Sequence, residues 1–205
     1  MKTHVKLFST ILFILLLSAF TGQQGYQVGD YATDFDLKGV DGQTVSLSDY
    51  EDAAGFILVF TCNTCPYAKM YEERIKALHA TFADKGFPVV AINPNCPERS
   101  PGDSMAKMKE RAQEKEFDFA YLQDETQDIT KAYGATNTPH VYILDKEAKD
   151  KYRVAYIGAI DNNYRDADKA DVHYVRDAVD ALLQDKKVPE TSTKAIGCTI
   201  KWKMS

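Results

Sequence analysis

The feature that most limits the fold is a buried-strand pattern followed at once by two cysteines and a helix. The run GFILVF, Gly55–Phe60, is apolar throughout, as expected for a central strand that is buried on both faces. Cys62 and Cys65 follow in the sequence CNTC. Pro66 is tolerated in the first turn of a helix, and apolar residues then recur at helical spacing to about Ala83. We therefore expect a strand, a CxxC loop and a long helix in succession.

Strands and helices continue to alternate after this unit. The run GFPVVAIN predicts a second buried strand, whose parallel pairing with the first makes a right-handed βαβ unit. A charged helix over Asp103–Glu116, a short strand FDFAYL and a helix ending at Gly134 are expected next. HVYIL and YRVAYIG flank the turn DKEAKD as an antiparallel hairpin, and a last helix covers Ala170–Gln184. The order indicates an α/β sandwich, preceded by a hairpin with strands near Phe35–Leu37 and Thr44–Leu47.

The N-terminus carries a targeting pattern. Two lysines precede an apolar segment over residues 7–20, and small and polar residues follow. The segment is shorter than the roughly 20 residues that a membrane-spanning helix needs, so a secretory signal peptide is favoured over an uncleaved anchor. We expect residues 1–22 to be the signal and 26–205 to form one domain, including a C-terminal tail over 186–205. The expected location is the periplasm or another exported compartment, without stable membrane insertion after cleavage.

Composition suits one domain and argues against nucleic-acid binding. The chain has 205 residues, of which 44% are hydrophobic, enough for a core of ordinary size. Its net charge is −5 at pH 7, and the predicted signal holds basic residues but no acidic ones. Its removal therefore makes the mature chain more acidic, and a basic surface for nucleic acid is not expected.

Export changes how the four cysteines are interpreted, because disulfides persist outside the cytoplasm. The sequence allows three full pairings of Cys62, Cys65, Cys96 and Cys198, and it leaves open whether Cys96 and Cys198 pair, stay free or resolve an intermediate. A zinc site usually needs two ligand pairs, and only one CxxC is present, so no metal is expected. A purely structural Cys62–Cys65 disulfide would close a very small loop with little entropic gain.

A working dithiol couple fits the CxxC best. Cys62 would lie where the strand ends and the helix begins, and there free N–H groups and the helix dipole favour a thiolate. Cys65, one turn further on, would attack a mixed disulfide formed at Cys62 and release the partner. Both residues are therefore predicted to be catalytic.

A second motif connects this unit to a known group of proteins. Thr138 and Pro139 stand just before the run HVYIL, and this arrangement resembles the cis-proline loop that faces the CxxC in the thioredoxin superfamily. The order of elements over about Tyr26–Leu183 is similar to that superfamily, and VGDYATDFDLKGVDGQTVSLSDY resembles the opening of its redoxin branch, the AhpC/TSA-like proteins. The resemblance implies a thioredoxin-like α/β/α sandwich with a central mixed sheet and an N-terminal redoxin-type hairpin extension. It also implies that Thr138, presented by a cis Pro139, binds an extended substrate segment beside Cys62.

Several positions depart from the thioredoxin pattern. Thr61 replaces the tryptophan expected before the first cysteine, and Phe56 replaces the usual buried acid. Asp124 and Glu125 are candidates for the missing proton acceptor, although loop acids are more often solvated. His140 is expected to face solvent on its strand, where an alternative role is to favour the thiolate.

The sequence thus predicts an exported thiol-disulfide oxidoreductase that needs no cofactor. Its expected partners are protein thiols or disulfides and a redox protein that donates or accepts electrons, the direction being open. A peroxiredoxin-like thiol peroxidase, an antioxidant acting on hydroperoxides, is the alternative; only part of the peroxiredoxin signature is present, because Cys62 replaces the threonine three residues before Cys65. A copper carrier or a redox-inactive binding protein is a further alternative, but copper carriers of this fold have a CxxxCP motif with one more residue between the cysteines.

Overall fold

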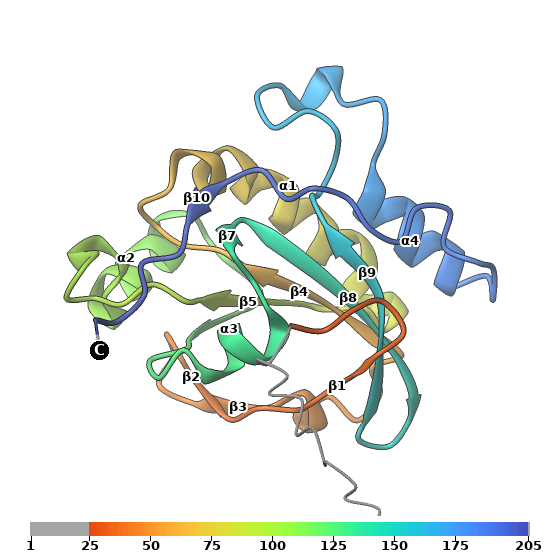
Figure 1. Ribbon diagram of the computed structural model, residues 1–205, viewed down its shortest axis with the longest axis horizontal. Coiled ribbons are helices and arrows are strands. Elements are labelled where there is room, and N and C mark those ends of the chain that lie inside the picture. Colours follow the sequence, from red (N-terminus) through yellow and green to blue (C-terminus); the bar gives the residue numbers. More distant parts are fainter. Residues whose placement is uncertain (1–24, 205) are drawn as a thin grey trace, which may run out of the picture.

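An eight-stranded sheet organises the computed structural model, which describes residues 25–204 (Figure 1). The strand order is β1-β9-β8-β4-β5-β6-β2-β3, and β7 and β10 form a separate two-stranded sheet. The strands are β1 Tyr31–Ala32, β2 Leu37–Gly39, β3 Thr44–Val45, β4 Gly55–Phe60, β5 Val89–Asn93, β6 Ala120–Gln123, β7 Asn137–Thr138, β8 His140–Ala148, β9 Lys151–Gly158 and β10 Cys198–Thr199. The helices are α1 Pro66–Phe82, α2 Met105–Glu114, α3 Asp128–Tyr133 and α4 Tyr174–Leu182.

The sheet is mixed, as expected. Strands β4, β5 and β6 are parallel, whereas β8 pairs antiparallel with β4, and β9 with β8. The expected N-terminal hairpin is present as β2 and β3, and β2 extends the sheet beside β6. The βαβ unit β4-α1-β5 lies in the middle of the sheet and places the loop between β4 and α1 at the end of a buried strand.

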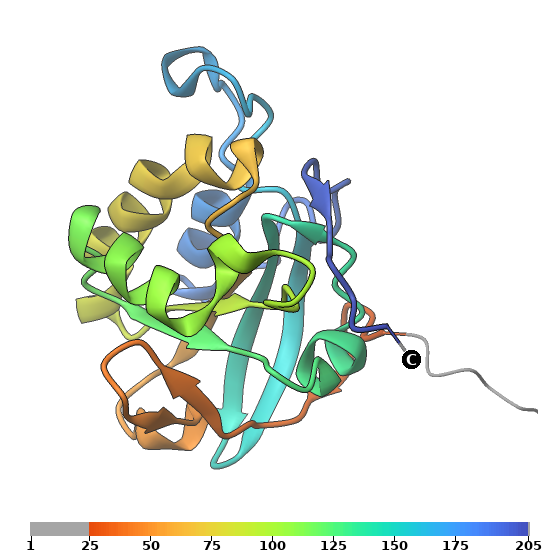
Figure 2. The same ribbon diagram turned by 90° about the vertical axis from the view of Figure 1, so that its left-hand side faces the viewer.

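Helices cover both faces of the sheet (Figure 2). Ile57 and Val59 of β4 belong to the cluster that packs against α1, α2 and α4. The alternate residues Phe56, Leu58 and Phe60 belong to the cluster on the opposite face, with Tyr133 of α3. Each fully buried side chain of this size contributes roughly 1.5–3 kcal/mol. The continuous apolar run of β4 is thus explained by burial on both faces, and its end is rigidly placed.

Some boundaries differ from the predicted ones. The predicted turn DKEAKD lies mostly inside strand β8, and the chain reverses at residues 149–150, where Asp150 has a φ of 55°. The second predicted helix is shorter, because a separate 3₁₀ turn, Pro101–Asp103, precedes α2. The last helix starts at Tyr174 rather than Ala170. The tail, which has no clear periodicity, forms strand β10.

The predicted signal, residues 1–22, lies outside the described residues, so the signal and the domain boundaries 26–205 remain predictions. Within residues 25–204, every helix is too short or too polar to cross a bilayer.

Candidate active site

The CNTC loop connects the end of β4 to the start of α1. Helix α1 begins at Pro66, as predicted, and its N-cap residue is therefore Cys65. The helix-terminal position expected for Cys62 thus falls on Cys65. Both residues are almost completely buried, with exposed fractions of 3% for Cys62 and 2% for Cys65. Neither forms a disulfide in this structure.

Thr138 contacts both thiols. The Cys62 Sγ atom lies 3.1 Å from Thr138 Oγ1, and the Cys65 thiol lies 3.1 Å from the carbonyl oxygen of Thr138, to which it donates in its protonated form. The Thr138–Pro139 peptide bond is cis, as expected. The structure therefore brings all four residues singled out in the sequence to one place, although they come from segments more than 70 residues apart.

The pKa values of the two CxxC thiols are shifted in opposite directions. The hydrogen bond from the Cys62 thiol lowers the pKa of Cys65, and the backbone N–H of Ala68 in the first turn of α1 and the Cys198 thiol act in the same direction. The same hydrogen bond, burial and the negative charge of Asp103 raise the pKa of Cys62. A pair coupled in this way loses its protons in two well-separated steps. The helix terminus thus favours negative charge at Cys65, and Asp103 disfavours it at Cys62.

Asp103 is a buried carboxyl group beneath the CNTC loop that sequence reasoning missed. Its side chain has no solvent exposure. Its Oδ1 accepts a hydrogen bond from the backbone N–H of Asn63 at 2.7 Å, and its Oδ2 accepts from the Thr64 hydroxyl at 2.7 Å and the Ser100 hydroxyl at 2.6 Å. Asn95 donates to Oδ2 as well, at 2.9 Å. This carboxyl group therefore fixes the two residues between the cysteines.

The signal that could have found Asp103 is its place in the chain. It follows β5 in the loop that leaves the C-terminal end of that parallel strand, where polar groups of open α/β sheets converge. The candidates named from sequence, Asp124 and Glu125, lie elsewhere. Asp124 is buried and accepts from the backbone N–H of Thr130 at 2.7 Å, which ties it to α3, and Glu125 is exposed.

The expected exposure of His140 is wrong. The side chain is only 9% exposed, because β8 lies between β4 and β9 and both of its faces are covered. Burial lowers the pKa of His140 to about 4. The imidazole is therefore neutral at neutral pH and contributes no positive charge to the cysteines.

The C-terminal tail crosses the site. It runs from α4 over the start of α1 to β10, next to β7 (Figure 1). In that pairing the Cα atoms of Cys198 and Thr138 are opposite each other. Cys198 is half-buried and packs against the cluster formed by Cys62, Cys65 and Ala68. Cys96, in contrast, donates from its thiol to Glu98 at 2.8 Å and lies outside that cluster.

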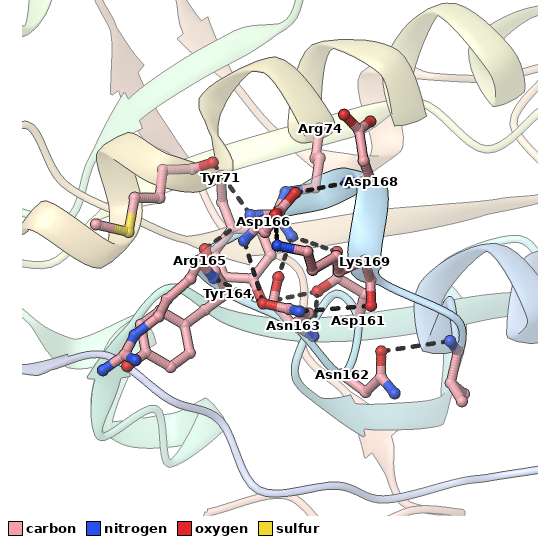
Figure 3. Close-up of polar contacts among 12 residues, drawn as sticks. Tyr71, Arg74, Asp161, Asn162, Asn163, Tyr164, Arg165, Asp166, Asp168 and Lys169 are labelled. Carbon is pink, nitrogen blue, oxygen red and sulfur yellow. Dashed lines mark hydrogen bonds and ion pairs between the residues drawn. The ribbon is translucent and has the colours of Figure 1, made fainter.

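A loop after β9 packs beside the first turns of α1. Figure 3 shows Tyr71 and Arg74 of α1 directed at Asp161 and the residues that follow it. Arg74 donates to Asp161 Oδ2 at 2.6 Å and to the carbonyl oxygens of Asn163 and Tyr164 at 2.7 and 2.9 Å. The ring of Tyr164 then lies 4.9 Å from that of Tyr67, at the start of α1. Arg74 thus anchors the loop beside the helix terminus that carries Cys65.

Within the described part of the chain, no three His, Cys, Asp or Glu side chains form a group that could hold a metal ion.

Comparison with known families gives the deciding observation. The family model described as "AhpC/TSA family" matches residues 28–153, more than half of the chain. The chain belongs to the AhpC/TSA family. Curated relatives include the thiol-disulfide oxidoreductases ResA of Bacillus thuringiensis, 23% identical over 158 residues, with 73% of this chain and 87% of the relative covered, and ResA of Geobacillus thermodenitrificans, 24% identical over 151 residues, with 69% and 82% covered.

Solved structures share the fold of this chain. An uncharacterised conserved protein of Geobacillus kaustophilus is 40% identical, with a TM-score of 0.79 and 87% of this chain and 94% of that chain covered. A hypothetical protein of Sinorhizobium meliloti is 30% identical, with a TM-score of 0.79 and 89% and 98% covered. A putative thiol:disulfide interchange protein DsbE of Chlorobium tepidum is 25% identical, with a TM-score of 0.59 and 77% and 98% covered. The predicted thioredoxin-like α/β fold and redoxin family are confirmed, and the predicted enzyme class is that of the named relatives.

Proposed function

We propose that Cys62 and Cys65 are the catalytic couple of an exported thiol-disulfide oxidoreductase that works through a mixed-disulfide intermediate. One observation carries this proposal: the two thiols, which lie at the start of α1, both contact Thr138. A thiolate favoured by a helix terminus and a second thiol beside it are the two groups that disulfide exchange needs. The oxidoreductase class of the ResA relatives supports the same reaction.

The reaction begins with the Cys65 thiolate. It attacks one sulfur of a partner's disulfide, a Cys65–partner disulfide forms, and the other partner sulfur leaves as a thiolate that takes up a proton. Cys62 then loses its proton and attacks Cys65, which releases the second partner sulfur and leaves a Cys62–Cys65 disulfide. The partner is reduced by two electrons and the couple is oxidised by two. This order differs from the one expected from sequence, which made Cys62 the first nucleophile, because Cys65 is the N-cap of α1.

The proposed partners are protein disulfides, or dithiols when the reaction runs in reverse, together with a redox protein that resets the couple. Thr138 and Pro139 would provide the substrate-binding edge through backbone pairing. Because β10 pairs with Thr138 in this structure, a partner segment can use that edge only after β10 has moved. Export is supported by the signal pattern of residues 1–22.

Turnover of a model protein disulfide tests the proposal. Purified protein is assayed for reduction of insulin by dithiothreitol, with Cys62→Ser, Cys65→Ser and Cys96→Ser variants alongside. We expect Cys65→Ser to fall to the rate of dithiothreitol alone, Cys62→Ser to lose most of its turnover, and Cys96→Ser to keep the wild-type rate. A folded Cys62→Ser or Cys65→Ser variant with wild-type turnover would show that the couple is not catalytic.

A further inference from the structure

The tail presents Cys198 where a partner's cysteine would be expected. Under the proposed function, on which this inference rests, a partner segment pairs with Thr138 beside the couple. In the structure that position is filled by β10, in which Cys198 is opposite Thr138. The contacts of Thr138 therefore include three cysteines: two through its side chain and carbonyl oxygen, and one through strand pairing.

Cys198 is in direct contact with the couple. It packs against the cluster of Cys62, Cys65 and Ala68. Burial, the interaction of its thiol with the Cys65 thiol and the charge of Cys65 raise the pKa of Cys198 to about 11. When Cys65 is part of a disulfide it carries no charge and accepts no proton, so two of these obstacles to a Cys198 thiolate are removed.

The tail is held in place on both sides of Cys198. Before it, Thr193 donates its backbone N–H to Ile157 of β9 at 3.0 Å. After it, the backbone N–H of Lys201 donates to Asn95 Oδ1 at 2.9 Å, and Ile200 is buried in the core. Such fixation from both ends holds the Cys198 thiol at the couple and keeps the entropic cost of bringing the sulfurs together low.

Gly197 allows this close approach. A Cβ atom there would lie 2.1 Å from the carbonyl oxygen of Thr138 and 3.0 Å from the nitrogen of Pro139. The Asn137 side chain donates to the carbonyl oxygen of Gly197 at 3.0 Å and fixes the backbone at this point. Only a residue without a side chain permits the tail to lie directly on the Thr138–Pro139 loop.

We propose that Cys198 is a third redox-active cysteine, which exchanges with the Cys62–Cys65 disulfide and forms a Cys65–Cys198 disulfide. In this step the Cys198 thiolate attacks Cys65 Sγ, the Cys65–Cys198 bond forms, and the Cys62–Cys65 bond breaks. Cys62 leaves as a thiolate and takes up the proton that Cys198 lost. No net oxidation occurs, so the step needs no reagent beyond the disulfide that the couple already carries.

The exchange explains how two almost fully buried cysteines can react with a large partner protein. Cys62 and Cys65 are at most 3% exposed, whereas Cys198 is half-buried. The exchange transfers one end of the disulfide to the more accessible sulfur, where a partner thiol can attack it. Cys198 thus acts as a relay between the couple and the surface.

Disulfide mapping tests the relay. The wild-type protein and a Cys62→Ser variant are oxidised with oxidised glutathione, quenched in acid, alkylated, digested and analysed by mass spectrometry. In the wild type we expect both a Cys62–Cys65 disulfide and a Cys65–Cys198 disulfide with Cys62 alkylated. In Cys62→Ser the Cys65–Cys198 disulfide should be the product, and a Cys96→Ser variant should map like the wild type.

Two outcomes separate this inference from the proposed function. If the wild type carries only the Cys62–Cys65 disulfide, and Cys62→Ser keeps glutathione on Cys65 while Cys198 is alkylated, the relay is refuted and the couple stands. If no Cys62–Cys65 disulfide forms and insulin turnover is absent, the proposed function itself fails.

A tail variant leaves all the cysteines intact. Gly197→Ala should push the tail off Thr138, and we expect the Cys65–Cys198 disulfide to be lost while the Cys62–Cys65 disulfide still forms. Thr199→Ala, at an exposed neighbouring position, is the matched control and should retain both. Retention of the Cys65–Cys198 disulfide in Gly197→Ala with the tail displaced, as judged by proteolysis, would contradict the role of this docking.

Discussion

Asp103 accepts a hydrogen bond from the backbone N–H of Asn63 at 2.7 Å, and this contact joins the loop after β5 to the loop that carries both cysteines. The two residues are 40 positions apart in the chain. The shape of the CNTC loop is therefore set by a carboxyl group from another segment as well as by the start of α1. The effects of this contact on stability and on the cysteine pKa values can be measured directly.

Asp103→Asn should destabilise the protein and change the cysteines together. The amide has one acceptor where the carboxyl has two, so donors from Thr64, Ser100 or Asn95 lose their partner, and the free energy of unfolding should fall by roughly 3 kcal/mol. Loss of the negative charge should lower the pKa of Cys62. Denaturant unfolding and thiolate absorbance measure the two effects. Asp118→Asn, at an exposed site, should change neither.

Thiolate absorbance of the reduced protein should report the lowered pKa of Cys65. The pKa of Cys65, about 5, lies well below the ordinary value of 9.0 for a cysteine thiol, so one thiolate should persist at neutral pH and disappear as the pH falls through about 5. Because the folded pKa is the lower one, this thiolate stabilises the reduced fold above the unfolded pKa, and the stabilisation is lost as pH falls through the folded value. A spectrum of Cys65→Ser that still shows a thiolate at neutral pH would assign the charge to Cys62.

The order of attack predicts which variant captures partners. A Cys62→Ser/Cys198→Ser double variant lacks both the proposed resolving thiol and the proposed relay thiol, so protein partners should accumulate as mixed disulfides on Cys65. Non-reducing gels and peptide mapping identify the sulfur. Adducts that accumulate in Cys65→Ser on Cys62 instead would restore the order expected from sequence.

His140 should make the protein less stable in mild acid. Its pKa in the folded protein, about 4, is below the ordinary histidine value of 6.5, so between these values the unfolded chain binds more protons than the folded one. Stability contributed by the neutral imidazole is therefore complete above about 6.5 and is lost as pH falls toward 4, by roughly 3 kcal/mol in total. His140→Leu should flatten this part of the stability curve, measured as the wild-type-minus-variant difference. An unchanged slope would mean that the imidazole is protonated in the folded protein.

The Arg74–Asp161 ion pair should matter far more than a surface pair. The side chains of Arg74 and Asp161 are only 15% and 2% exposed, and Asp161→Asn leaves a buried guanidinium without its charge partner, which should cost roughly 3 kcal/mol. Lys107→Ala removes an exposed pair with Glu110 and should change stability by less than about 1 kcal/mol. Thermal unfolding of both variants makes the comparison. Equal effects would show that the loop after β9 is held by other contacts.

Local patterns account for what could be predicted. Strand β4, the start of α1 at Pro66 and the proline loop are each encoded in fewer than 20 neighbouring residues, and their order is enough to suggest the family. Asp103 could not be assigned, because its role depends on a contact with Asn63 that exists only in the folded chain. His140 was misjudged because strand alternation holds only for a sheet with one exposed face. Strand β10 is two residues long, too short for any periodicity to be detected.

The C-terminal tail, whose strand β10 pairs with Thr138, also competes with partner proteins for that binding edge. A segment tethered close to its binding edge has an effective concentration on the order of millimolar, and the tail is anchored in the core by Val188, ten residues before Cys198. A free polypeptide present at micromolar concentration must therefore bind Thr138 about a thousandfold more tightly than the tail does, a difference of roughly 4 kcal/mol. Short peptides with few contacts fall below that threshold. Under the proposed function, partners that dock at Thr138 are therefore those that bring an extended complementary surface.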